Sequence, residues 1–423
     1  MVTREKNTSR VSRNNSVAQN RNVGPKRVRL NLWGRAKAIF DNYFLHQSFH
    51  FYKTVMLILF IVGLGLVSVF SASHVSSIKT YGNPFFDFFM QTVFAIAGLL
   101  CMVVLSTMSS IQIEKFGRFL LACAVGGQLL VKVPGIGRSA GGNSNWIAIG
   151  PITIQPSEFL KLGMIIYLAT LIAPKLDEMD DFHNGPKQFI TLGMIGAGAV
   201  AILGNDLGTA IVMVLVLLLM LFLLNMPSYY LLRITAAVVA LGVIAIMSSG
   251  SRRARFGAFI ARILDPSQIS LDGTGWQTEH GFWGLAFGGI TGNGLGQSKL
   301  DWGWIPEIQN DFIFANIGEE HGLLGALLVI LLFFALAKYI LHIANSTPDP
   351  FARVVSIGVM LWLLVQAYIN IAVVLGLGPV LGVPLPLISK GGSSLLAVMM
   401  ALGVVLSFER NSQSVPVRSS RRI

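Results

Sequence analysis

The sequence of 423 residues contains little charge and almost no cysteine. Only 12% of its residues are Asp, Glu, Lys or Arg, against roughly 25% in an average soluble domain. A soluble globule of this length needs more polar surface, so an ordinary cytosolic enzyme is excluded. The two cysteines, Cys101 and Cys123, lie in apolar runs and lack the spacing of a disulfide framework or a zinc site. We interpret them as buried thiols.

Acidic residues are also scarce: 20 acids stand against 32 basic residues, for a net charge of +12. Fifteen of those basic residues lie near the two ends, eleven in 1–53 and four in 409–423. Basic segments beside membrane spans are typical of cytoplasmic positions. No stacking or groove-reading element accompanies them, so nucleic acid is not an expected partner. The basic start is also unlike a cleavable signal peptide.

Apolar runs long enough to cross a membrane recur along the chain. A helix needs about 20 apolar residues to cross the bilayer. The sequence predicts an all-α polytopic membrane protein with about ten transmembrane helices, at 54–73, 86–107, 117–133, 157–174, 188–204, 207–225, 229–248, 322–344, 352–376 and 391–408.

The even number of predicted helices places both basic tails on one side, which we expect to be the cytoplasm. The predicted organisation is a basic cytoplasmic tail with an interfacial helix at 1–53, a ten-helix membrane domain at 54–408 and a basic cytoplasmic tail at 409–423. A large extracytoplasmic loop, 249–321, precedes the eighth helix. The expected location is the cytoplasmic membrane, crossed many times.

The predicted loop 249–321 is too apolar to be a linker, since it holds 8 of the 20 acids but also 4 of the 7 tryptophans. In its first part, apolar residues recur at helical spacing, namely Phe256, Phe259, Ile260 and Ile263. A row of arginines lies on the opposite side of this predicted helix. That pattern is typical of a helix lying in the membrane interface. A similar helix is predicted for 32–44. Either helix anchors the protein or grips lipid phosphates.

Ionisable residues at membrane depth are costly and are therefore functional candidates. Glu158 and Lys161 open the predicted fourth helix, three residues apart on one face, where they can form an ion pair. Asp206 lies between two spans, where it can cap the next helix. Both the structural and the functional interpretation remain open for these residues.

Four acids lie within the segment that precedes the predicted eighth helix: Glu307, Asp311, Glu319 and Glu320. Asp311 is followed by Phe-Ile-Phe, which indicates a carboxylate held against apolar surface. Burial raises the pKa of a carboxyl group and can fit it for base catalysis. Glu319 and Glu320 either contribute to the site or cap the eighth helix.

The last predicted outer loop runs into the tenth helix as Ser389-Lys-Gly-Gly-Ser-Ser394. Exposed amides at a helix start, next to Lys390, can hold an anion such as a pyrophosphate. Together with Glu158, Asp206, Asp311 and Glu319, this segment falls at the outer ends of the predicted spans. The sequence therefore predicts an outward-facing polar cavity.

At these motifs the chain resembles the SEDS family (shape, elongation, division and sporulation), whose members include FtsW and RodA. The matching stretches begin at Trp146, Ile154, Asp206, Asp311 and Pro384, and read WIAIGP, IQPSE with Lys161, DLGTA, DFIF…GEE and PLPLIS…GGSS. The resemblance covers about residues 50–408. The long basic N-terminal tail favours the FtsW branch, whereas the Gly-Val-Pro-Leu-Pro stretch is closer to RodA.

This resemblance implies peptidoglycan glycosyl transfer, in which lipid II, a disaccharide-peptide on undecaprenyl pyrophosphate, is polymerised during cell division. The family's essential aspartate maps to Asp311 and its lysine after QPSE maps to Lys161. The implied partners are a class B penicillin-binding protein and other divisome proteins, with a divalent cation such as Mg or Mn. The chain departs from the family at Gln309-Asn310, where His-Thr is frequent, and at Lys390, where Tyr is frequent.

The mechanism expected from these residues has Asp311 as the catalytic base. The substrate-binding candidates are Glu158, Lys161, Arg262, Gln277, Lys390 and Ser393, and further candidates are Asp206, Glu307, Glu319 and Glu320. A RodA-type elongation polymerase has the same chemistry and remains an alternative. Polar residues inside a helix bundle also fit a lipid II flippase or transporter, and a scaffolding protein is a third class.

Overall fold

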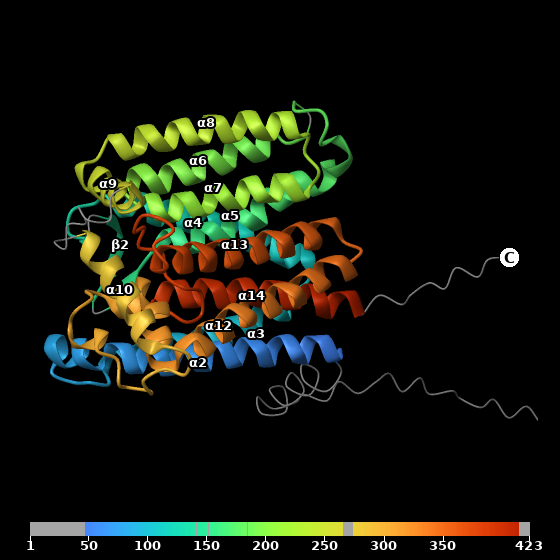
Figure 1. Ribbon diagram of the computed structural model, residues 1–423. Coiled ribbons are helices and arrows are strands. Elements are labelled where there is room, and N and C mark those ends of the chain that lie inside the picture. The colour runs from blue at the N-terminus through green and yellow to red at the C-terminus, as the bar shows by residue number, and fades with distance from the viewer. Residues whose placement is uncertain (1–46, 141–142, 151, 184, 265–273, 414–423) are drawn as a thin grey trace, which may run out of the picture. The chain divides into compact units, whose positions relative to one another are not determined.

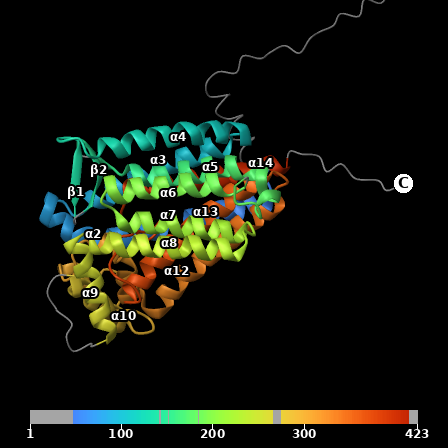
Figure 2. The ribbon, with the colours of Figure 1, turned by 90° about the horizontal axis from the view of Figure 1, so that it is seen from above.

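The structure is a computed structural model and describes residues 47–413 apart from 141–142, 151, 184 and 265–273. A helix covers each of the ten predicted spans, and these helices lie with their axes roughly parallel (Figures 1 and 2). They are α2 (Phe49–Tyr81), α3 (Phe86–Ser106), α4 (Ser110–Leu130), α5 (Pro156–Ile172), α6 (Lys187–Leu203), α7 (Leu207–Leu223), α8 (Ser228–Met247), α12 (Ile313–Ser346), α13 (Pro350–Val374) and α14 (Gly392–Gln413). The predicted all-α polytopic fold is confirmed.

Seven helices of the described residues are long and apolar enough to cross a membrane: those beginning at Phe49, Phe86, Pro156, Ser228, Ile313, Pro350 and Gly392. Two more, α6 and α7, are apolar but have 17 residues each. The remaining one, α4, carries three charged side chains: Glu114, Lys115 and Arg118. The bundle is packed around α13 and α14, the most buried of the seven, whereas α8 has no buried residue.

The first and last helices of the bundle meet at one end. The Ser48 hydroxyl donates a 2.6 Å hydrogen bond to Glu409, so the start of α2 adjoins the end of α14. We call this the terminal end, and the opposite end, with the sheet, α9 and α10, the loop end (Figure 1). The last helix runs to Gln413, five residues past its predicted end. The predicted interfacial helix at 32–44 and the tail after 413 lie outside the described residues.

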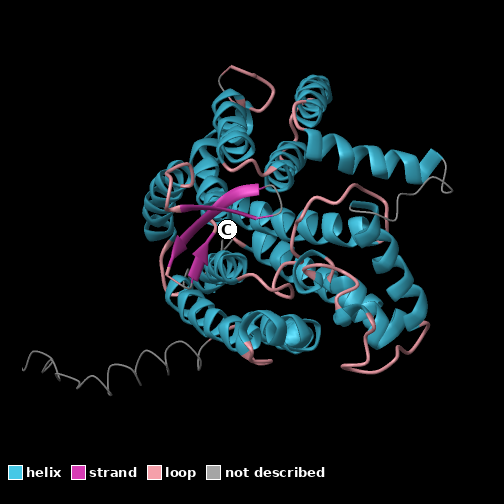
Figure 3. Ribbon diagram, turned by 90° about the vertical axis from the view of Figure 1, so that its left-hand side faces the viewer, coloured by secondary structure: helices cyan, strands magenta, loops and turns pink. Residues whose placement is uncertain are grey.

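A small antiparallel sheet, which the sequence analysis did not predict, lies at the loop end (Figure 3). Its strands are β1 (Gly137–Ala140), β2 (Asn143–Ile149) and β3 (Ile152–Ile154). Ala148 of β2 is paired with Thr153 of β3, and the Ser144 amide donates to the Gly204 carbonyl between α6 and α7. The sheet thus fixes the side chain of Asn145 beside that turn.

The predicted loop 249–321 is largely helical. It contains α9 (Gly250–Leu264), α10 (Thr274–Gly288), the 3-10 turn η3 (Leu300–Trp302), α11 (Ile308–Asp311) and the start of α12. The amphipathic helix predicted in its first part is confirmed: α9 runs crosswise to the bundle and leaves Phe256 and Ile263 exposed (Figures 1 and 2).

The eighth predicted helix begins at Ile313, nine residues earlier than expected, and is interrupted at Gly322. Gly322 has φ 65° and ψ −162°, and a Cβ atom there would lie 2.4 Å from the Ile290 carbonyl oxygen. Only glycine fits such a position. Glu319 and Glu320 therefore belong to a short helical segment before the interruption, and the expectation that they cap the eighth helix is wrong.

Candidate functional site

Asp311 lies at the loop end, as the last residue of the four-residue helix α11. Phe312, with φ −113° and ψ 15°, separates α11 from α12. Phe312, Ile313 and Phe314 are at most 2% exposed, so the apolar residues after the carboxylate anchor it to the bundle. The apolar residues after Asp311 are thus buried, as the Phe-Ile-Phe pattern predicted.

The surroundings of Asp311 favour a carboxyl group that titrates near neutral pH. The pKa of Asp311 is raised to about 6 overall: burial is the largest cause and the charge of Glu307 adds to it, whereas a main-chain hydrogen bond and the charge of Arg255 lower it. The glycine that faces the carboxylate, Gly382, has φ +69°, and a Cβ atom there would lie 3.8 Å from Asp311 Oδ2. The arrangement suits a general base whose carboxylate faces the main chain at Gly382.

We expect the activity that depends on Asp311 to rise with pH. A base acts in its ionised form, so with a pKa of about 6 the rate should rise as the pH increases through 6 and level off above it. The check is kcat/KM for product formation from pH 5 to pH 8. A rate that is constant over this range, with the protein stable throughout, would contradict a base of this pKa.

Glu307, next to this site, holds the short helix through its side chain. It is exposed, has a left-handed φ of 55°, and accepts hydrogen bonds from Asn310 at 2.8 Å and Gln309 at 3.3 Å. The main-chain carbonyl of Gln309 accepts a bond from the Lys390 amide at 2.9 Å. The segment before Asp311 is thereby tied to the turn that starts α14.

That turn is held from α3 by two side chains that the sequence analysis missed. Lys390 Nζ lies 2.8 Å from Asp87 Oδ2, so its charge is paired inside the protein. Gln91, one helical turn later, donates to the Ser389 carbonyl and accepts from the Gly391 amide. Because both residues lie in an apolar run, only their spacing of four residues could have indicated a shared role.

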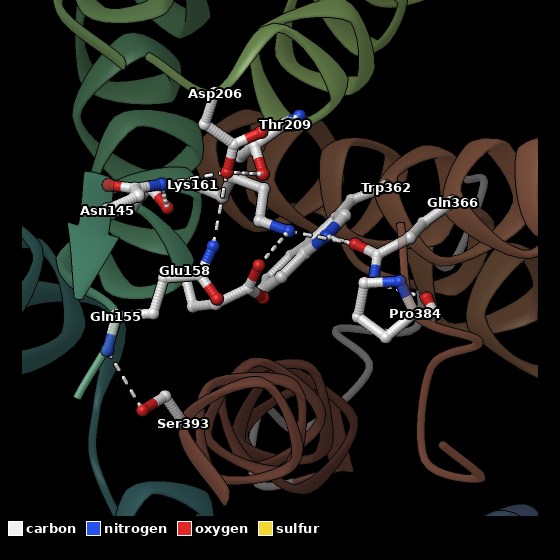
Figure 4. A network of polar contacts seen from close by, with 11 residues as sticks. Asn145, Gln155, Glu158, Lys161, Asp206, Thr209, Trp362, Gln366, Pro384 and Ser393 are labelled. Atoms are coloured by element: carbon white, nitrogen blue, oxygen red, sulfur yellow. Dashed lines mark hydrogen bonds and ion pairs between the residues drawn. The ribbon is translucent and has the colours of Figure 1, made fainter. Parts of the chain in front are cut away.

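Glu158 and Lys161 form the predicted ion pair. Their side chains lie 2.8 Å apart with 1% and 4% exposure. Lys161 also donates to Gln366 at 2.8 Å and lies over the ring of Trp362 (Figure 4). The pair belongs to the contact between α5 and α13, where its charges are covered by protein.

Asp206 caps α7, as predicted, through a 3.0 Å bond from the Thr209 amide. Its other carboxylate oxygen accepts from Asn145 and Gln155, which come from β2 and from the start of α5 (Figure 4). The Ser393 hydroxyl accepts a 3.0 Å hydrogen bond from the main-chain N–H of Gln155. This network joins the sheet, α5, α7 and α14 at the loop end.

Glu319 and Glu320 hold the segment that follows α10. Glu319 accepts bonds from Ser298 and from the Lys299 amide, and Glu320 accepts from Ser71 and from the Gly296 amide. Asp301 is buried beside them, and its pKa is raised to about 8 by burial and then by the charges of Glu320 and Glu319. These acids stabilise the loop that leads to Asp311.

Three of the four arginines of α9 turn toward the protein, and the fourth, Arg253, is exposed. Arg252 donates to Asn205, Arg255 to the Val380 carbonyl at 3.5 Å, and Arg262 lies 3.4 Å from Glu279. A cavity of about 240 Å³ has both charged and apolar walls, which include Arg252, Arg255, Leu207, Ile211, Ile246 and Phe256. Gln277 of α10 donates to the Pro306 carbonyl at 3.3 Å, just before Glu307.

The candidates thus lie at one end of the bundle, where they form separate groups with their own partners. Asp311 with Arg255, the network of Asp206, and the pair Glu158–Lys161 are three of these groups. Within the described residues, no three or more His, Cys, Asp or Glu side chains are grouped so as to hold a metal ion.

The family model described as Cell cycle protein, which covers FtsW, RodA and SpoVE, matches residues 52–414. Stage V sporulation protein E of Bacillus subtilis (strain 168) is 34% identical over 368 residues, which are 85% of this chain and 96% of that protein. The probable peptidoglycan glycosyltransferase FtsW of Geobacter metallireducens is 33% identical over 353 residues, which are 83% and 92% of the two proteins.

Among solved structures, one chain is described under the heading "Structural coordination of polymerization and crosslinking by a peptidoglycan synthase complex". It is 26% identical to this chain and superimposes with a TM-score of 0.67, over 86% of this chain and 98% of that one. Sequence and fold therefore agree over nearly the whole described region.

Proposed function

The chain belongs to the cell cycle protein family of FtsW, RodA and SpoVE and is a peptidoglycan glycosyltransferase, and we propose that it polymerises lipid II with Asp311 as the catalytic base. The observation that carries this assignment is the carboxylate of Asp311 at the loop end, anchored by buried Phe312 and Ile313, with its pKa raised to about 6. Such a group is ionised at neutral pH and still basic enough to accept a proton.

In the proposed reaction the 4-hydroxyl of an acceptor sugar attacks the anomeric carbon of a lipid-linked donor. A new C–O bond forms there as the bond to the pyrophosphate breaks. The hydroxyl proton passes to Asp311, and undecaprenyl pyrophosphate leaves with the electron pair of the broken bond. Negative charge develops on the leaving group, where cationic side chains stabilise it.

The cavity beside α9 supports a lipid pyrophosphate as the substrate. Arg252 and Arg255 provide positive charge at one wall, and Ile211, Ile246 and Phe256 provide an apolar wall. A ligand with an anionic head and a hydrocarbon chain matches both walls. The charge of Arg255 also lowers the pKa of Asp311, which supports a substrate that reaches from the charged wall to the proposed base. We keep four other residues as proposed substrate-binding residues, each of which also contacts a protein group: Arg262, Gln277, Lys390 and Ser393.

We propose that a divalent cation such as Mg²⁺ or Mn²⁺ is bound through the substrate pyrophosphate and not by the free protein. Mg²⁺ is commonly held by one or two carboxylates together with substrate phosphates, and the described residues lack a larger group of ligands. We expect the purified protein to bind Mn²⁺ weakly alone and at least tenfold more tightly with lipid II, as measured by calorimetry. Equal affinity in both states would contradict this proposal.

The protein is a multi-pass membrane protein. We propose that it lies in the cytoplasmic membrane with the terminal end in the cytoplasm, works with a class B penicillin-binding protein and divisome proteins, and acts in cell division. Labelling of single cysteines at the loop end of intact cells tests the orientation. Filamentous cells after depletion would support division, whereas rounded cells would support the elongation role of a RodA-type protein.

The decisive experiment is polymerisation of lipid II by the purified full chain with its transpeptidase partner. We expect glycan strands on gels of the products. Transport of a fluorescent lipid II across vesicle membranes, without any glycan product, would instead support a flippase.

A further inference from the structure

We propose that Asn370, a buried residue of α13, is a positioning residue that holds the main chain of Asp311 against the loop that faces its carboxylate. The inference rests on the proposed function, because it takes Asp311 to be the base. Asn370 lies within the ninth predicted span, where the sequence analysis assigned no function to it.

The contacts of Asn370 join two separate segments. Its Nδ2 atom donates to the main-chain carbonyl of Asp311 at 2.9 Å and to that of Val383 at 2.8 Å, and the residue is 1% exposed. Both partners can only accept, so the orientation of the amide is set by chemistry: the opposite orientation would turn its own oxygen toward two carbonyl oxygens. One amide group therefore uses both of its hydrogens to tie α11 to the loop after α13.

The position of these carbonyls explains what the amide controls. Asp311 ends α11, and the last carbonyls of a helix have no partner within it. Val383 directly follows Gly382, the glycine whose missing Cβ would lie 3.8 Å from the Asp311 carboxylate. Asn370 thus sets the spacing between the carboxylate and the wall opposite it.

The same face of α13 holds the next residue of that loop. Gln366, one helical turn before Asn370, donates to the Pro384 carbonyl at 2.9 Å and is fully buried. Its Oε1 atom accepts from Lys161 at 2.8 Å and from Trp362 at 2.7 Å (Figure 4). Lys161 and its partner Glu158 thereby orient Gln366, and through it the loop at 383–384, without any contact with Asp311 itself.

The test measures the steady-state rates of Asn370→Ala for lipid II polymerisation. Loss of both donors should lower kcat at least tenfold and leave KM for lipid II within twofold of wild type, because the base is displaced while the lipid-binding walls are kept. The matched control is Ser356→Ala in the same helix, since Ser356 is fully buried and its hydroxyl has no hydrogen-bond partner among the described residues. We expect wild-type kinetics from it.

A second measurement separates positioning from a general structural role. In an Asp311→Asn background, adding Asn370→Ala should reduce the residual rate no further, because the group that Asn370 positions has already lost its function. A further tenfold loss in that background, or an equal loss in Ser356→Ala, would overturn the proposal.

If Asn370→Ala does not fold, Asn370→Ser decides the question, since a hydroxyl keeps one donor. We expect Asn370→Ser to have a kcat below that of wild type but above one-tenth of it, with KM unchanged. A wild-type kcat would overturn the inference.

If Asp311→Asn itself polymerises lipid II normally, the proposed function of Asp311 is wrong. If that variant is inactive while Asn370→Ala behaves as wild type, only the positioning role of Asn370 is wrong.

Discussion

The Asp311→Asn variant is expected to polymerise lipid II roughly 10²–10⁴-fold more slowly than wild type, the usual contribution of a general base. Asparagine has the shape of aspartate but cannot accept the proton of the attacking hydroxyl. The main-chain bond from Asn370 to residue 311 does not depend on the side chain, so the local backbone should be retained. The measurement is the initial rate of glycan synthesis by purified protein, with the melting temperature as a check on folding.

Glu307→Gln is the matched control for this variant. Glu307 lies four residues away, is exposed, and contacts Gln309 and Asn310. Its loss removes one nearby negative charge, which should lower the pKa of Asp311 slightly and leave the rate at neutral pH within a few-fold of wild type. If Glu307→Gln were inactive and Asp311→Asn active, Glu307 would be the base and our assignment would fail.

The Lys161→Met variant is expected to lose about 3–5 kcal/mol of stability, because it leaves the carboxylate of Glu158 buried without its cation. Glu158 is 1% exposed and its partner ammonium lies 2.8 Å away. One of its two oxygens, Oε2, already has no hydrogen-bond partner among the described residues. Water cannot reach the uncompensated charge, so the folded state must either carry it or take up a proton. The check is unfolding in detergent micelles, followed by circular dichroism.

Two further variants separate the buried charge from other effects of this change. Glu158→Gln combined with Lys161→Met removes both charges and should recover most of the lost stability, since a neutral replacement of a buried pair is often close to neutral overall. Arg118→Met breaks an exposed pair in α4, where Arg118 lies 3.2 Å from Glu114, and should cost only about 0–1 kcal/mol. Equal destabilisation by Arg118→Met and Lys161→Met would contradict the explanation.

The positions of the helices could be predicted because the pattern that sets them is local. Each long apolar run must satisfy its backbone internally in a membrane, so it forms a helix wherever it lies in the bundle. The cap formed by Asp206 and the pair formed by Glu158 and Lys161 were predictable for the same reason, since each involves residues three apart. The sheet at 137–154 was missed because its strands are short and lie between two spans.

The partners of the site residues could not be predicted, because they come from distant parts of the chain. Lys390 forms an ion pair with Asp87, which lies roughly 300 residues earlier in the sequence. Asn370 donates a hydrogen bond to Asp311, which lies 59 residues earlier. Neither Asp87 nor Asn370 has a distinctive neighbour in sequence that would single it out. The interruption at Gly322 was equally invisible, since its cause is the close approach of the Ile290 carbonyl.

By itself, the sequence determined that this is an all-α membrane protein with its acids gathered in one loop, and it singled out Asp311, because hydropathy and the apolar residues after a carboxylate are properties of neighbouring residues. Only the tertiary structure decided which basic side chains form ion pairs within the protein and which side chain holds the main chain of Asp311. Lys390, Arg262 and Lys161 each lie against a protein acid, while Asp311 does not contact a basic side chain at ion-pair distance among the described residues. The physical reason is that pairing and burial depend on packing between helices far apart in the chain, which no local pattern specifies.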